Sequence, residues 1–127
     1  MKRLLVISAF MIVSVATYAQ TQYTVVKVAT VSVNSSGQWG NAPFKQLSKT
    51  FIAFLYSNYL VFDEGFDGKG DTYYKFAREI DLPDKRKWNA TDRNGTACEI
   101  TIKDFGSYTL IAIKYMNSNQ ATVYQTL

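Results

Sequence analysis

Residues 63–71 hold the densest group of side chains that could do chemistry, with four acids and three glycines in nine positions. Carboxylate oxygens in a glycine-rich loop are ligands that Ca²⁺ accepts. The EF-hand pattern fails, however, because the loop counted from Asp67 has Thr72 where the motif requires glycine and Arg78 where it requires glutamate. We interpret the segment as a hairpin tip that its acids keep soluble, and we predict no metal site and no cofactor.

Side chains for catalysis are scarce in this chain. It contains no histidine and one cysteine, which excludes Ser-His-Asp and Cys-His catalysis, histidine-ligated metals and an intramolecular disulfide. Paired carboxylates remain, but most of the ten acids fall in predicted turns. None lies in an apolar strand phase, where burial would raise its pKa. We predict that the protein is not an enzyme, and a small hydrolase is the least favoured alternative.

Three aromatic residues are the candidates for ligand binding. Trp39 lies in a loop without apolar neighbours in sequence, where an indole either caps the open end of a core or stacks on a sugar or peptide. Tyr108 and Tyr124 are predicted on the outer face of the last strands. That face is either covered by the N-terminal strands or exposed as an aromatic surface for a ligand or partner.

Charge gives little ground for a nucleic-acid partner. The chain has 14 Lys+Arg against 10 Asp+Glu, and loss of Lys2 and Arg3 with the signal described below leaves 12 against 10, or +2. The basic run 85–87 before Trp88 is typical of a solvated strand entry, although a nucleic-acid or acidic-glycan site could begin in this way. The expected partner is an unknown small molecule, glycan or protein.

The elements that position these residues are predicted to be strands. Val, Ile, Thr and Tyr are abundant, and turn residues recur about every 8–12 positions. This indicates one all-β domain, an antiparallel meander of about eight strands that forms a barrel (calycin-like) or a sandwich. The predicted strands cover residues 23–33, 49–56, 59–64, 71–77, 86–92, 96–104, 108–116 and 120–126. Such a meander resembles lipocalin-like and streptavidin-like barrels in architecture alone, which implies no function.

Two segments allow more than one interpretation. The apolar residues of 44–55 also fit a helical stripe, but the run of aromatic and branched residues favours a strand over 49–56. The first strand changes its apolar phase between Val28 and Val31. A β-bulge near 29–30 would explain the change, and so would a long strand that crosses between two sheets or runs round a barrel.

The last four strands can be given a register, because paired residues must lie on one face of a sheet. A three-residue loop at 93–95, a two-residue turn at 106–107 and a three-residue loop at 117–119 together give one continuous apolar face. The predicted pairs are Trp88 with Ile100, Ala90 with Cys98, Ile102 with Ile111, Ile100 with Ile113, Cys98 with Tyr115, Ile113 with Val123 and Tyr115 with Ala121. Cys98 is therefore expected to be a small buried hydrophobe.

Residues 1–19 have the pattern of a secretory signal peptide. Lys2 and Arg3 precede an apolar stretch too short for a stable membrane span, and Ala19 ends a small-residue cleavage site. We expect a mature domain of residues 20–127 that is secreted or periplasmic and has no transmembrane segment. The predicted function is a small exported binding module, and the alternative is a structural or assembly protein that acts through an exposed strand edge.

Overall fold

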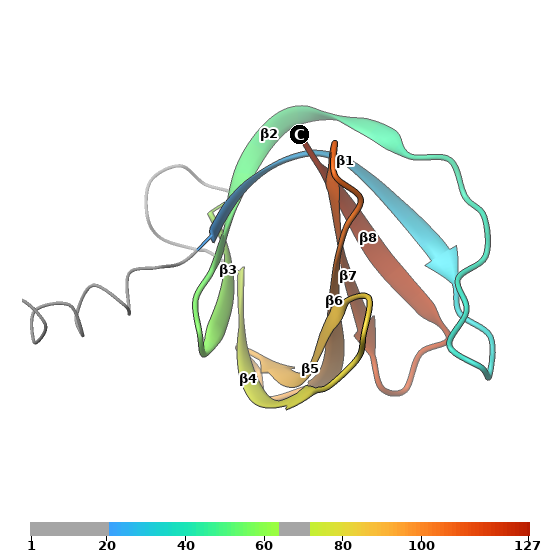
Figure 1. Cartoon of the computed structure of the whole chain (residues 1–127), viewed down its shortest axis with the longest axis vertical. Helices are drawn as coiled ribbons and strands as arrows, with labels where there is room; N and C mark the ends of the chain where they lie inside the picture. Colours follow the sequence, from blue (N-terminus) through green and yellow to red (C-terminus); the bar gives the residue numbers. More distant parts are fainter. Residues whose placement is uncertain (1–20, 64–71) are drawn as a thin grey trace, which may run out of the picture.

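The structure, a computed structural model, describes residues 21–63 and 72–127. Eight antiparallel strands follow one another in these residues and close into a barrel, in the order β1 to β8 (Figure 1). The strands are β1 Thr21–Ser32, β2 Lys45–Leu55, β3 Tyr59–Asp63, β4 Thr72–Ile80, β5 Arg86–Asp92, β6 Ala97–Asp104, β7 Thr109–Tyr115 and β8 Gln120–Thr126. The all-β antiparallel meander is confirmed, and of the two predicted forms it takes the barrel. No helix in the described ranges is long and apolar enough to cross a membrane.

The barrel interior is a packed core of side chains contributed by all eight strands. Burial alternates along β2, where Phe51, Ala53 and Leu55 point inward, because successive side chains of a strand point to opposite faces. Phe62 is fully buried, and the centroid of its ring lies 5.2 Å from that of Phe51 and 4.9 Å from that of Tyr124. The region 49–55 is a strand, as predicted, and β2 begins four residues earlier.

A second apolar cluster lies on the outside of the barrel. It is formed by Ala29, Val31, Leu110, Ala112, Ala121 and Val123 from β1, β7 and β8. The connection between β1 and β2 returns over this cluster, where Val33, Ala42 and Phe44 pack against it. The outer face of the last strands is therefore largely covered by the N-terminal part of the chain. This is the first of the two alternatives given above for that face.

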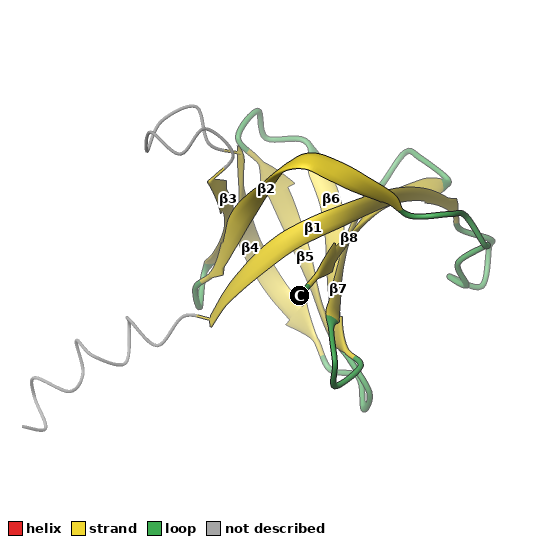
Figure 2. Ribbon diagram, turned by 90° about the horizontal axis from the view of Figure 1, so that it is seen from above, coloured by secondary structure: helices red, strands yellow, loops and turns green. Residues whose placement is uncertain are grey.

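Strand β1 belongs to both apolar clusters, since it crosses the barrel obliquely beside β2 and β8 (Figure 2). Its first half points Val25 into the interior, and its second half points Ala29 and Val31 outward. The pairing register shifts between Val25 and Lys27, so the extra residue of the bulge is Val26. The predicted phase change is present, but its predicted position near 29–30 is wrong by about three residues.

The predicted registers of the C-terminal hairpins are confirmed for two hairpins and wrong for the third. Trp88 pairs with Ile100 and Cys98 with Tyr115, as expected. Between β7 and β8, however, the observed pair is Ala112 with Val123, because the loop spans the four residues 116–119. A slip of one residue turns every side chain of a strand to the other face. Val123 therefore joins the outer cluster, and its neighbour in β8, Tyr124, points into the interior.

Candidate functional site

A short hairpin at the end of β1 positions Trp39. The Oδ1 atom of Asn34 accepts hydrogen bonds from two backbone amides of the turn, both at 2.9 Å. Gly37 adopts a left-handed φ of 82°, a conformation that glycine takes without steric cost. The turn brings Trp39 back into antiparallel pairing with Val33, so the indole is held by the backbone of the hairpin.

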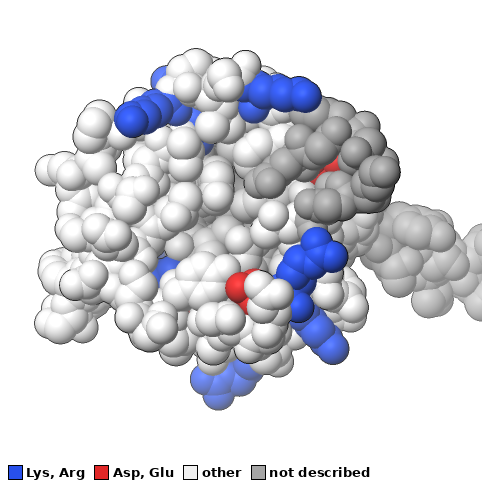
Figure 3. All heavy atoms as spheres, turned by 180° about the vertical axis from the view of Figure 1, so that it is seen from behind, with Lys and Arg blue, Asp and Glu red and all other residues white. Residues whose placement is uncertain are grey.

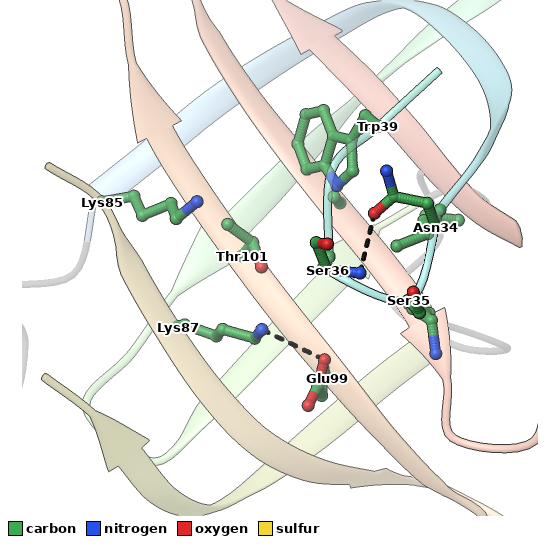
Figure 4. Close-up of a pocket in the computed structure, with 13 residues that line it drawn as sticks. Asn34, Ser35, Ser36, Trp39, Lys85, Lys87, Glu99 and Thr101 are labelled. Carbon is green, nitrogen blue, oxygen red and sulfur yellow. Dashed lines mark hydrogen bonds and ion pairs between the residues drawn. The ribbon is translucent and has the colours of Figure 1, made fainter. Parts of the chain in front are cut away.

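A groove of about 330 Å³ separates this hairpin from the outer face of β5, β6 and β7 (Figure 4). We call it the polar lobe. Figure 4 shows the indole and Asn34 on the hairpin side, opposite Lys87 of β5 and Lys85, which directly precedes that strand. The principal side chains around the polar lobe are Asn34, Ser36, Trp39, Lys85, Lys87, Glu99, Thr101 and Lys114.

A second hollow of about 370 Å³ adjoins the polar lobe. The two share Trp39, Lys85 and Thr101 among their lining residues, and the second adds Phe105 and Leu110. We call it the aromatic lobe, since Trp39 is 36% exposed and Phe105 45% exposed. The two lobes form one groove on the outside of the barrel, at which both an aromatic and a hydrogen-bonding surface are available.

Strand alternation divides the basic run between two faces of the sheet. Lys85 and Lys87 line the groove, whereas Arg86 lies 4.7 Å from the centroid of the Trp88 ring and pairs with Glu79 at 3.1 Å. Trp88 itself is 3% exposed and belongs to the interior. The run is therefore not one basic patch, and only its alternate members contribute to the groove.

The lysines of the groove differ in how far their charge is neutralised. Lys87 pairs with Glu99 at 3.2 Å, and Lys103 approaches Asp84 at 3.5 Å. No ion pair is formed by Lys85 within the described residues.

Lys114, in contrast, donates to a backbone carbonyl at 3.4 Å. Among the described residues, the lining of the two lobes contains four lysines and one glutamate, and this part of the surface attracts anions.

Of the three predicted binding residues, the structure places two near the groove. Trp39 lines both lobes, against the sheet and not over an end of the barrel. Tyr108 stacks on Phe105 at 5.1 Å with an interplanar angle of 17°, so it supports a lining residue. Tyr124 contacts Phe62 and Phe51 in the interior. Its predicted position on the outer face is wrong, because it rested on the incorrect β7–β8 register.

Sequence reasoning named the basic run 85–87 as a place where a nucleic-acid or acidic-glycan site could begin, but it connected neither this run nor the hairpin that begins at Asn34 with Trp39. The turn that begins at Asn34 repeats the chemistry of the turn that begins at Asp92, with a glycine at the fourth position in each, which would have identified the first hairpin. Lys85 and Lys87 are separated by two positions, the period that places two side chains on one face of a strand.

A partly buried chain of hydrogen bonds joins Tyr74, Tyr115 and Asp92, away from the groove. The Tyr115 hydroxyl donates to Asp92 Oδ2 at 2.9 Å and accepts a hydrogen bond from Tyr74. Burial, reinforced by the bond to Asp92, raises the pKa of Tyr115 to about 12. Burial also raises the pKa of the Cys98 thiol to about 11. These groups keep their protons at neutral pH and are not prepared for nucleophilic or acid–base chemistry.

Positive charge is scattered on the face of the molecule seen in Figure 3. Lysine and arginine side chains lie there in separate groups near the margin, and most of the centre is uncharged. This face lacks the continuous basic surface that a nucleic-acid backbone requires.

No cluster of three or more potential metal ligands occurs within 21–63 and 72–127. The acidic segment 63–71 lies, apart from Asp63, outside the described residues.

Comparison of the chain with protein-family models, curated proteins and solved structures finds no match.

Proposed function

We propose that the protein is a small exported binding module, without catalytic activity, that holds a small molecule or a saccharide in the groove beside Trp39. One observation carries the proposal. A tryptophan with 36% of its surface exposed is held by a hydrogen-bonded hairpin above a groove lined with polar side chains. Most tryptophans bury the ring, and one fixed at the edge of a groove offers a flat apolar surface for a ligand.

The construction of the groove supports binding. Its floor consists of β5, β6 and β7, whose inner faces belong to the packed core. The core therefore holds the backbone from which the side chains of the outer face extend. Its roof is a hairpin fixed by the Asn34 turn. A ligand that enters such a site loses little affinity to ordering of the protein.

The chemistry of the lining supports a binding role over a catalytic one. The groove offers ammonium, amide and hydroxyl groups, and its one carboxylate, Glu99, is engaged by Lys87 at 3.2 Å. A hydrolase needs a nucleophile or an attacking water paired with a base. Assembly through a strand edge is not proposed, because the described strands close into a ring in which each has two neighbours.

Export is the second part of the proposal, and it rests on the sequence of residues 1–19. N-terminal sequencing of the protein recovered outside the cytoplasm tests it. We expect the first residue to be Gln20. A recovered protein that retains residues 1–19 would contradict the predicted cleavage.

A binding screen with two matched variants tests the site. Saccharides and small metabolites are titrated against the purified protein, and binding is followed by tryptophan fluorescence and calorimetry. Trp39→Ala should weaken any bound ligand at least about tenfold. Tyr59→Ala is the control, because Tyr59 is 40% exposed on β3 and does not line the groove. Binding that survives Trp39→Ala, or no binding across the panel at millimolar concentration, would contradict the proposal.

A further inference from the structure

We propose that the ligand of this groove is an anionic saccharide, with one sugar ring against Trp39 and its acidic group beside Lys85. This inference rests on the proposed function and specifies the ligand class of the same site. It combines the excess of positive charge on one side of the groove with the aromatic surface on the other.

Lys85 lines both lobes of the groove. Its side chain is partly buried at the junction of the two lobes, and no acidic side chain among the described residues pairs with it. Lysine stems commonly lie along apolar surface while the ammonium group stays in water. Here the ammonium group is available at the point where the lobes meet, and a ligand anion would supply the missing partner.

Neighbouring charges strengthen the preference for an anion. The ammonium group of Lys114 donates to a backbone carbonyl and forms no ion pair within the described residues, so it adds to the positive potential of the polar lobe. Glu99 is held by Lys87 on the floor of that lobe. Its charge is thereby compensated, and it opposes an incoming anion less than a free carboxylate would.

The neutral part of the ligand follows from the remaining lining. Ser36 and Thr101 present hydroxyl groups in the polar lobe, which suit a molecule with many hydroxyls, whereas the side chain of Asn34 is engaged within its own hairpin. Trp39 and Phe105 present ring surfaces in the aromatic lobe, which suit the apolar face of a sugar ring. A simple inorganic anion would use the lysines alone, whereas a sugar acid uses both surfaces.

Calorimetry with three tetrasaccharides tests the inference. The probes are tetragalacturonate, its fully methyl-esterified form and a sulfated galactan tetrasaccharide, each measured at low and at high ionic strength. The ester keeps the rings and removes the charge. We expect at least one charged probe to bind about tenfold tighter than the ester at low ionic strength. We also expect the difference to shrink when salt screens the charges. The charged probe that binds more tightly identifies the acid as carboxylate or sulfate.

Two lysine variants provide the matched comparison. Lys85→Gln should weaken the preferred charged probe about threefold to fivefold and leave the ester unchanged. Lys75→Gln should change neither affinity, because Lys75 is exposed on β4 and lies outside the groove. Thermal melting of both variants confirms that they fold.

The outcomes separate this inference from the function on which it rests. If the charged probes and the ester bind with equal affinity, and Trp39→Ala abolishes binding of both, the proposal of an anionic ligand is wrong and the proposal of a binding module stands. Charge-dependent binding that Lys85→Gln and Lys75→Gln weaken equally would also overturn it, since the effect would then be general attraction. If none of the three probes binds, the inference is wrong, and the wider screen with Trp39→Ala decides the proposed function.

Discussion

Asp92 is a single carboxylate with two structural roles. Its Oδ1 atom accepts the backbone amides of Asn94 and Thr96, both at 2.9 Å, and thereby closes the β5–β6 turn. Its Oδ2 atom accepts the hydroxyl of Tyr115 at 2.9 Å. The amide of Thr96 contributes most to lowering the pKa of Asp92 below its usual range, because these donors favour the charged form.

This lowered pKa predicts a pH-dependent contribution to stability. A carboxylate whose pKa is lower in the folded state than in the unfolded state stabilises the protein fully at pH values above its unfolded-state pKa, which is about 3.9 for aspartate. This stabilisation is lost as the pH falls through the pKa of the folded state. The wild type should therefore melt at a higher temperature than Asp92→Asn, and this difference should be largest at neutral pH. The difference should shrink below about pH 4. A difference that stays constant across this range would show that the charge of Asp92 does not matter.

Cys98 is the second residue-scale case, and its predicted burial is confirmed. Burial raises its pKa to about 11, so little thiolate exists at neutral pH and thiol reagents should react only on unfolding. Cys98→Ser should lower the free energy of unfolding by about 1–3 kcal/mol, because a hydroxyl would enter an apolar interior. Urea denaturation measures this change, and Cys98→Ala separates the cost of the hydroxyl from that of lost packing. Modification of the native protein within seconds would contradict the buried position.

Two hairpins show how the same turn chemistry serves different elements. Asn34 and Asp92 each accept two turn amides, and Gly37 and Gly95 take left-handed φ values of 82° and 83°. One hairpin lies in the wall of the barrel and the other outside it. Their disruption should therefore have different consequences.

Gly95→Val should lower the free energy of unfolding by about 1–3 kcal/mol, since a branched side chain is strained at this φ.

Gly37→Val should act mainly on its hairpin and release the indole of Trp39. Acrylamide quenching detects the release, because the second tryptophan, Trp88, is buried. Gly37→Asn is the control, since asparagine tolerates the left-handed region. Equal loss of global stability in both valine variants would show that the outer hairpin is part of the cooperative unit.

Turn chemistry decided which registers could be predicted from the sequence. The loops with Gly95 and Gly106, at φ values of 83° and 93°, allow only a few geometries. The predicted registers of the two hairpins that they close, β5–β6 and β6–β7, are correct. The β7–β8 register was not predictable from apolar pattern, because Leu110–Ile113 is buried on both faces and either alignment buries apolar residues.

The candidate site was predictable to a similar, limited extent. Trp39 is identifiable as a loop tryptophan without apolar neighbours, and the structure places it at the groove. The groove itself is not, because it depends on the return of the β1–β2 connection over strands distant in sequence. Phe105 precedes a turn glycine, a position that carries no sign that the ring is exposed, and the error at Tyr124 follows from the misplaced register.

At the scale of the whole molecule, β8 joins the end of the sheet to its beginning. It pairs with β1 over Val25–Ser32 and with β7 over Leu110–Ile113. It also supplies Ala121 and Val123 to the outer cluster and Tyr124 to the interior. No other described strand can replace these contacts without opening the barrel.

A chain that ends at Asn119 should therefore fail to fold, rather than fray at one edge. Near-ultraviolet circular dichroism and the dispersion of amide resonances measure this outcome. The full chain is the reference, and a chain without Leu127 alone should remain folded because that residue is exposed. A truncated chain with native-like dispersion would show that β1 and β7 can pair directly.

The pairing of the first strand with the last also sets when the protein can complete its folding. Val25 and Thr126 are partners although about 100 residues of chain lie between them, and contacts between such distant segments form slowly. During synthesis seven strands emerge before the strand that completes the ring. Until β8 has been synthesised the ring stays open, so the closed barrel forms only when nearly the whole chain is available.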